Sequence, residues 1–318
     1  MNGGFKDKVL HRFLFYVKLY LCHLHSNKLL MKNIHLFNVS TSGSSASLWL
    51  NNLINDLGNI SFHGLRSDPF STEAQSRNRT DISSQSPEQV FRGLRLLGCA
   101  ALSMSPQSEY DSSFGRMTLG VVHNFYTSSE VIEVFKQMGG GRNLAVFRNP
   151  VHRINSQFQA SYIAMINRQW RKEFYAMLQQ NDNCFYSTLV QFIEKYDDVK
   201  AETMAIFDLF LNKIIESDID NQKACNEHER LFYEDMFKDV DGTMEKIGYL
   251  LDRSISEIPF DAFTQKKNQH VVNPKNKLDT WSDFPKILKD RIFHVVIPKE
   301  RYVEAYRQLN YNVEEIGL

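Results

Sequence analysis

Short apolar runs alternate along this chain with longer segments of helical periodicity, and this alternation constrains its fold more than any other feature. The apolar runs are IHLFNV (34–39), ISFH (60–63), MTLGVVHNF (117–125), LAVF (144–147) and RLFYED (230–235). Buried strands that alternate with amphipathic helices are typical of a parallel sheet covered on both faces. We therefore predict an α/β fold, a three-layer sandwich around a central parallel sheet of about five strands.

Helix boundaries are visible at several places between these runs. Leu50, Leu53, Ile54 and Leu57 recur at helical spacing, and Gly58 follows where a helix ends in a left-handed residue. The sequences SPEQ (86–89) and TSSE (127–130) predict capped helix starts. Three glycines at 139–141 predict the end of the second of these helices.

The later part of the chain is less regular. Helical spacing extends from Arg153 to about Gln180, and further helices are predicted near 200–216 and 244–251. Residues 260–318 have no clear pattern. We expect residues 31–318 to form one domain, preceded by an extension of residues 1–30. The apolar patch in that extension is too short and too interrupted by charges to span a bilayer, and a peripheral amphipathic helix is the alternative.

Composition limits the classes of ligand. Lys plus Arg and Asp plus Glu both total 37, so a general nucleic-acid partner is disfavoured and a small-molecule or glycan partner is expected. The four cysteines, at positions 22, 99, 184 and 225, form no C-x-x-C pair. They therefore signal neither a metal site nor a disulfide framework, and a cytoplasmic location fits them best.

Two segments after predicted strands are suited to binding anions. STSGSSAS (40–47) joins a strand to a helix, where backbone N–H groups and a helix N-terminus form an anion nest. The Walker pattern is not met, and an ordinary small-residue turn is the alternative. Arg148 directly follows a strand, and Ser156 lies eight positions later on a predicted helix, so both are candidates for one phosphate. A solvated arginine is the alternative there.

Neighbouring residues have simpler expectations. Tyr233, at the end of the last apolar run, is a candidate for stacking on a base, with a core tyrosine as the alternative. We expect His152 and Arg153 to face solvent and to have no functional role.

The order and spacing of these segments resemble the sulfotransferases that use 3'-phosphoadenosine 5'-phosphosulfate, a family with a P-loop-like fold. The segments concerned are the S-G-S-S loop, VFRNPVHRINSQF and LFYEDMFKDVDGTMEKIGYLL. The resemblance implies that Arg148 and Ser156 contact the 3'-phosphate and that Tyr233 packs near adenine. It also implies a 5'-phosphosulfate loop, whose residues here are Thr41, Ser42, Gly43, Ser44 and Ser45. No metal is implied.

The chain departs from the family pattern at two places. The family's loop usually carries lysine or arginine where Thr41 stands, and that cation stabilises charge on the leaving oxygen. Arg66, Lys275 and Lys277 are candidate replacements, and a noncatalytic nucleotide-binding relative is the alternative. The family motif R-K-G-x-x-G-D-W-K of the phenol and steroid branch is absent. The resemblance therefore points to bacterial or carbohydrate-type relatives.

Histidine is the expected general base. The resemblance places the base on the strand before the 3'-phosphate motif, where His123 stands, and an imidazole pKa suits proton transfer at neutral pH. His63, at the end of the second apolar run, is the rival base or an acceptor-binding residue. The segment NRQWRKEFY (167–175) is either an anionic-glycan contact or a solvated amphipathic helix. A P-loop small-molecule kinase is disfavoured because the Walker lysine is missing.

Overall fold

The computed structural model describes residues 33–41, 47–63, 86–104, 117–122, 126–236, 238–254, 256, 285–292 and 299–311. Several predicted features lie outside the described residues. They are the extension 1–30, Ser42, Gly43, Ser44, Ser45, Arg66, His123, Lys275 and Lys277.

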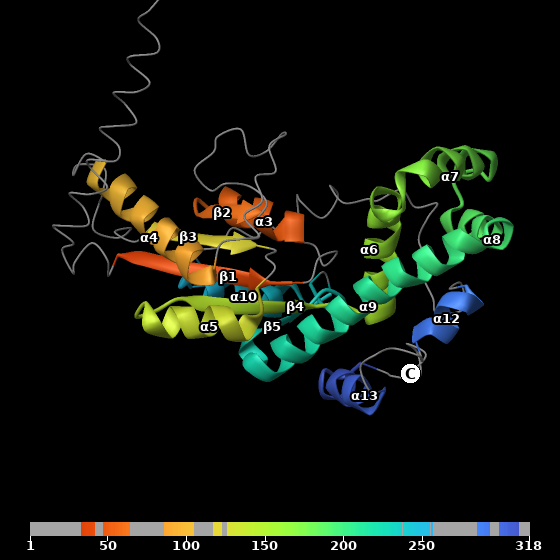
Figure 1. Cartoon of the computed structure of the whole chain (residues 1–318). Coiled ribbons are helices and arrows are strands. Elements are labelled where there is room, and N and C mark those ends of the chain that lie inside the picture. Colours follow the sequence, from red (N-terminus) through yellow and green to blue (C-terminus); the bar gives the residue numbers. More distant parts are fainter. Residues whose placement is uncertain are drawn as a thin grey trace, which may run out of the picture. The chain divides into compact units, whose positions relative to one another are not determined.

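A five-stranded sheet forms the centre of the fold, with strand order β2-β3-β1-β4-β5 (Figure 1). The strands are β1 (Ile34–Ser40), β2 (Ile60–His63), β3 (Met117–Val122), β4 (Arg142–Phe147) and β5 (Arg230–Phe232). β1 and β2 each pair in parallel with β3, and β4 pairs in parallel with β5. The predicted α/β class with a parallel sheet of five strands is confirmed.

The described chain forms two compact units. One has its described residues within the bounds 1–40, 48–144 and 241–264, and the other has them within the bounds 41–47, 145–240 and 265–318. Strand β4 contributes residues to both units. The expectation of one domain over residues 31–318 stays a prediction.

In the first unit, helices cover both faces of the sheet. Its helices are α3 (Ser47–Asp56), α4 (Pro87–Met104), α5 (Ser128–Gln137) and α10 (Val240–Leu251). On one face of the sheet, Leu36 of β1 and Leu119 and Val121 of β3 belong to one buried cluster. The cluster also includes Phe91 of α4 and Phe135 of α5. Successive strand residues point to opposite faces. His35 accordingly reaches the carbonyl of Leu250 in α10, 2.8 Å away, so the unit has helix, sheet and helix layers.

Buried polar side chains join the end of β1 to β4. The Asn38 Nδ2 group donates to Asn143 Oδ1 at 2.6 Å and to Ser40 Oγ at 2.8 Å. Asn143 in turn donates to Ser128 Oγ at 3.0 Å. Each of these side chains is at most 2% exposed, so the loss of one would leave its partners without water to replace it. This network fixes the position of β1 at the point where its following loop begins.

The second unit is built around one long helix. Its helices are α6 (Pro150–Met165), α7 (Arg168–Gln180), α8 (Phe185–Lys195), α9 (Asp197–Ala224), α12 (Lys286–Ile292) and α13 (Lys299–Gln308). α9 has 28 residues and contacts α6, α8, α12 and α13 (Figure 1). Phe158 of α6 packs against Tyr162 of the same helix and against Phe207 of α9, and Tyr162 shares a 2.8 Å hydrogen bond with Thr203 of α9.

The boundaries predicted from turn and cap residues are confirmed where the structure describes them. The Ser86 hydroxyl accepts from Gln89 N, and Gln89 accepts from Ser86 N, which caps α4. Thr127 and Glu130 form the corresponding capping box of α5. Gly58 has the left-handed φ of 77° expected at its helix end.

Other boundaries were less accurate. The segment 153–180 is two helices, α6 and α7, and α9 extends beyond the predicted 200–216 at both ends. β5 ends at Phe232, so Tyr233 and the two residues after it lie in a turn instead of the predicted strand. Within the described part of the chain, no helix is both long and apolar enough to cross a membrane.

Candidate functional site

The candidate site lies at the carboxyl ends of β1 and β4, which are neighbours in the sheet. In the strand order, β2, the strand that follows β1 in the sequence, lies towards one edge of the sheet. β5, the strand that follows β4, lies at the opposite edge. Thr41 directly follows β1, and Arg148 directly follows β4. A reversal of this kind is a topological switch point, where open α/β sheets bind their ligands. The side chains of Thr41, Arg148, Arg153, Asp218, Tyr233 and Glu234 all belong to the second unit.

Arg148 and Tyr233 lie against each other, although they are far apart in the sequence. Tyr233 N donates to Phe147 O at 2.8 Å, which continues the pairing of β4 with β5 and places Tyr233 beside Arg148. The guanidinium carbon of Arg148 lies 4.4 Å from the centre of the Tyr233 ring. Burial lowers the pKa of Arg148. Because the ordinary pKa of an arginine is very high, the guanidinium still stays charged at neutral pH. The stacked guanidinium is therefore a preorganised cation.

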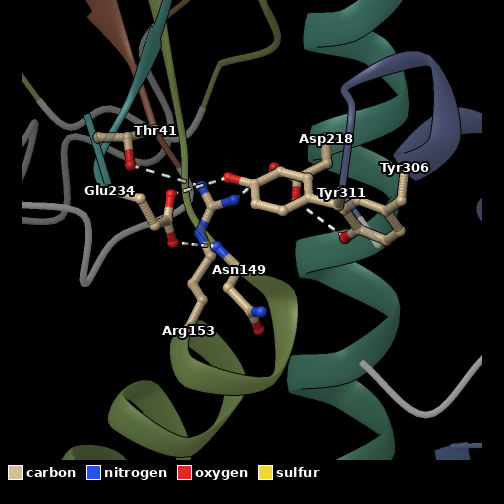
Figure 2. A network of polar contacts seen from close by, with 7 residues as sticks. All are labelled: Thr41, Asn149, Arg153, Asp218, Glu234, Tyr306 and Tyr311. Atoms are coloured by element: carbon tan, nitrogen blue, oxygen red, sulfur yellow. Dashed lines mark hydrogen bonds and ion pairs between the residues drawn. The ribbon is translucent and has the colours of Figure 1, made fainter. Parts of the chain in front are cut away.

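Glu234 holds the start of α6 beside this pair. Its Oε1 accepts from Asn149 N at 2.7 Å, and its Oε2 accepts from the Tyr311 hydroxyl at 3.1 Å. Figure 2 shows the Glu234 carboxylate between the backbone of Asn149 and the ring of Tyr311. A carboxylate at a helix N-terminus is favourable, and here it also partly offsets the positive potential at Arg148.

Arg153 is the second cation of the site, and it is fully buried. Its Nη1 group forms an ion pair with Asp218 Oδ1, and its Nη2 group donates to Thr41 Oγ1 at 3.4 Å (Figure 2). The other Asp218 oxygen accepts from the Tyr306 hydroxyl at 2.9 Å. Exposed fractions are 0% for Arg153, 1% for Asp218 and Tyr306, and 3% for Thr41. The side chains thus connect α6, α9 and α13 to the residue that follows β1.

The prediction that Arg153 faces solvent was wrong. Position 153 lies on the side of α6 that packs against α9, and the charge is tolerated there because Asp218 neutralises it. The sequence contained one signal of this pairing. Asp218 interrupts an otherwise apolar stripe of α9 that includes Leu211, Ile215 and Ile219. A carboxylate at such a position needs a buried partner.

Burial, with smaller opposing effects of Arg153 and the Tyr306 hydroxyl, raises the pKa of Asp218. Burial also raises the pKa of four tyrosines in this unit above the ordinary value of 10.0: Tyr162, Tyr186, Tyr306 and Tyr311.

We expect this protein to lose stability steeply as the pH rises above 10.0. The four tyrosines stay neutral in the folded state but ionise in the unfolded chain, so the stabilisation is complete below that pH and is lost above it. Each one lowers the free energy of unfolding by up to about 1.4 kcal/mol per pH unit. Urea unfolding across a pH series measures the slope. A free energy of unfolding that does not fall as the pH rises above 10.0 would contradict the expectation.

The remaining predicted site residues are more scattered. Ser156 is half-buried on α6, two turns after Arg148 and one turn after Arg153. His63 is the last residue of β2 and pairs in register with Val122. β3 separates β2 from β1, so His63 is two strand spacings, roughly 10 Å, from β1.

Within NRQWRKEFY, several side chains have structural contacts, among them Trp170, Arg171 and the buried Phe174. Trp170 packs against Tyr196 with ring centres 4.7 Å apart, and it also contacts Phe192. Arg171 donates to the backbone carbonyls of Ala164 and Ile166 at the end of α6. These contacts favour the interpretation of this segment as an amphipathic helix that holds α6 and α8 together.

The described part of the chain contains no cluster of three or more His, Cys, Asp or Glu side chains arranged to hold a metal ion. What the described site presents is one stacked arginine after β4, together with a second, buried arginine that Asp218 neutralises and that contacts the threonine after β1. This arrangement is suited to an anionic ligand that extends across the ends of β1 and β4. No protein-family model matches the chain, and comparison with curated proteins and with solved structures finds no significant similarity.

Proposed function

We propose that this protein transfers a sulfuryl group from 3'-phosphoadenosine 5'-phosphosulfate to an acceptor hydroxyl, on a small molecule or a carbohydrate. The observation that carries the proposal is the stacking of Arg148 on Tyr233 at the end of β4. The resemblance assigns these two residues to neighbouring parts of one nucleotide, the 3'-phosphate and the adenine. Their contact in the fold supports a common ligand.

The proposed binding mode uses both anion segments. The 3'-phosphate would contact Arg148 and Ser156, while the loop from Thr41 to Ser45 would bind the 5'-phosphosulfate through its N–H groups and hydroxyls. About 9 Å of helix rise separates Pro150 from Ser156, so one phosphate would contact both only if the Arg148 side chain extended along α6.

The proposed reaction is an in-line substitution at sulfur. His123, or His63 as the rival, would remove the proton of the acceptor hydroxyl. The acceptor oxygen would then form a bond to sulfur while the bond from sulfur to the 5'-phosphate oxygen breaks. The products are a sulfate ester and adenosine 3',5'-bisphosphate. A reducing location such as the cytoplasm suits the proposal, because the four cysteines are widely spaced in the sequence and form no C-x-x-C pair.

A noncatalytic nucleotide-binding protein is the second candidate. The observation that favours it is that Arg153, the cation that contacts Thr41, is already neutralised by Asp218. A positioned group that stabilises developing charge contributes roughly 2.7 to 4 kcal/mol to catalysis. Without an effective cation at this end of the donor, binding would persist while transfer became slower by orders of magnitude.

Nucleotide-dependent thermal stability tests the proposal. We expect adenosine 3',5'-bisphosphate, at about 100 times its Kd, to stabilise the protein by about 2.7 kcal/mol, with no comparable effect of ATP. A preference for ATP would contradict the proposed site and favour a kinase. Labelled donor with a mixed panel of hydroxyl acceptors then measures turnover. Tight binding of the bisphosphate without transfer to any acceptor would favour the noncatalytic candidate.

A further inference from the structure

The start of α6, next to Arg148, is capped by a residue from a distant part of the chain. Asn149 precedes Pro150, the first residue of α6, and its side-chain oxygen accepts from His152 N at 3.4 Å. In a capping box, the third helical residue is a glutamate or glutamine that accepts from the N–H group of the capping residue. A histidine stands at that position here, and Glu234 Oε1 accepts from Asn149 N at 2.7 Å instead. The Glu234 carboxylate therefore has a fixed place beside the residue that follows Arg148.

Tyr311 holds the other oxygen of this carboxylate. Its hydroxyl donates to Glu234 Oε2 at 3.1 Å (Figure 2). Its ring lies edge-on to Phe232 of β5, with the ring centres 6.0 Å apart, and this contact fixes the direction of the hydroxyl. Each carboxylate oxygen thus has a donor other than Arg148.

The charge of Glu234 still acts on Arg148. Burial lowers the pKa of Arg148, while Tyr233 and the Glu234 carboxylate oppose that effect, so the carboxylate lies within electrostatic range of the guanidinium. A negative charge beside a cation that binds an anion lowers the positive potential that the ligand meets. The hydrogen bonds to Asn149 and Tyr311 limit this competition, because they hold the carboxylate on other donors.

We infer that Tyr311 is a positioning residue that acts through Glu234 on the affinity of Arg148 for the 3'-phosphate of the nucleotide. The inference rests on the proposed function, because it takes Arg148 to be a ligand of that phosphate. By donating to Glu234 Oε2, the Tyr311 hydroxyl keeps the carboxylate from turning to Arg148. Without the hydroxyl, the free oxygen would pair with the guanidinium, and the phosphate would meet a partly neutralised cation.

Two nucleotides isolate the contact with the 3'-phosphate. Adenosine 3',5'-bisphosphate and adenosine 5'-monophosphate differ only in that group, so the ratio of their Kd values measures its contribution. For Tyr311→Phe, we expect the Kd of the bisphosphate to rise about fivefold and that of the monophosphate to change by less than about twofold. Isothermal titration calorimetry at constant salt measures both constants.

The variant Glu234→Gln separates an effect of charge from an effect of structure. Glutamine keeps an oxygen that can accept from Asn149 N, but it removes the negative charge beside Arg148. We expect it to bind the bisphosphate about fivefold more tightly, because the positive potential at Arg148 is no longer offset. A purely structural role of Glu234 would produce the opposite change, a weaker complex.

A double variant tests whether Tyr311 acts through the carboxylate. In Tyr311→Phe with Glu234→Gln, no carboxylate is left to turn to Arg148, so the bisphosphate should bind as tightly as it does to Glu234→Gln alone. Tyr162→Phe is the control, because it removes another tyrosine hydroxyl of the same unit, one that shares a 2.8 Å hydrogen bond with Thr203. It should leave both Kd values unchanged. Urea unfolding of each variant confirms that the protein compared is folded.

The outcomes distinguish the inference from the proposed function. A wild-type protein that does not prefer the bisphosphate to the monophosphate contradicts the proposed function, and the inference fails with it. If the wild-type protein has this preference, but Tyr311→Phe has no effect or weakens binding equally with and without the Glu234 charge, the inference is wrong and the proposed function stands. The same holds if Glu234→Gln weakens the bisphosphate. A loss in Tyr311→Phe that disappears in the double variant supports both.

Discussion

Replacing Asp218 by alanine should lower the free energy of unfolding by about 3 to 5 kcal/mol. The substitution leaves the Arg153 guanidinium, which is 0% exposed, without its counter-ion and without water to replace it. It also removes the acceptor of the Tyr306 hydroxyl. Urea unfolding at neutral pH, followed by circular dichroism, measures the change.

Asp208→Ala provides a control on the same helix. Asp208 forms an ion pair with Arg291 of α12, but the side chains are 24% and 40% exposed, so we expect a loss of no more than about 1 kcal/mol. The double variant Arg153→Met with Asp218→Leu should recover most of the loss of Asp218→Ala, because it leaves no buried charge unpaired. Equal losses in Asp218→Ala and Asp208→Ala would contradict a buried ion pair at Arg153.

Arg148→Ala should raise the Kd for adenosine 3',5'-bisphosphate by at least about thirtyfold. Truncating one partner of a desolvated, hydrogen-bonded charge pair costs roughly 2 to 5 kcal/mol of binding. Arg148→Lys should recover only part of the affinity, because an ammonium group lacks the planar fork that contacts phosphate oxygens in pairs and stacks on Tyr233. Isothermal titration calorimetry at constant salt measures the constants.

Arg142 offers a matched control for this substitution. Its guanidinium carbon lies 4.6 Å from the centre of the Tyr249 ring, so it is a cation stacked on a tyrosine like Arg148, but it stands at the start of β4 and not at its end. Arg142→Ala should reduce stability without changing nucleotide affinity. An Arg148→Ala variant that binds as tightly as Arg142→Ala would rule out Arg148 as a phosphate ligand.

The elements that position the site were largely predictable because they depend on local patterns. Buried strands appear as apolar runs, and the cap residues Ser86 and Thr127 satisfy N–H groups within their own first helical turn. Glycine at 58 is needed for a left-handed backbone whatever the rest of the fold does. The loop after β1 and Arg148 after β4 could be proposed as one site because the carboxyl ends of parallel strands meet at one edge.

The contacts inside the site were not predictable in the same way. An arginine near a helix N-terminus has the same local pattern whether it faces water or another helix, and Arg153 was therefore assigned to solvent. Glu234 and Tyr311 were not recognised for a similar reason, since each acquires its partner only when the turn after β5 and the end of the chain come together. Likewise, nothing local to Asn38 indicates that Asn143 will satisfy it.

Taken by itself, the sequence determined the strands and most helices of the first unit, because side-chain periodicity and capping act over a few residues. The anion-binding positions that it indicates stay a prediction. The tertiary structure alone decided which charges are buried and with which partners. Arg153 and Asp218 are 65 positions apart, and whether either is solvated depends on the packing of α6 against α9. Burial makes such a pairing obligatory, because an uncompensated charge in a dry interior costs several kcal/mol.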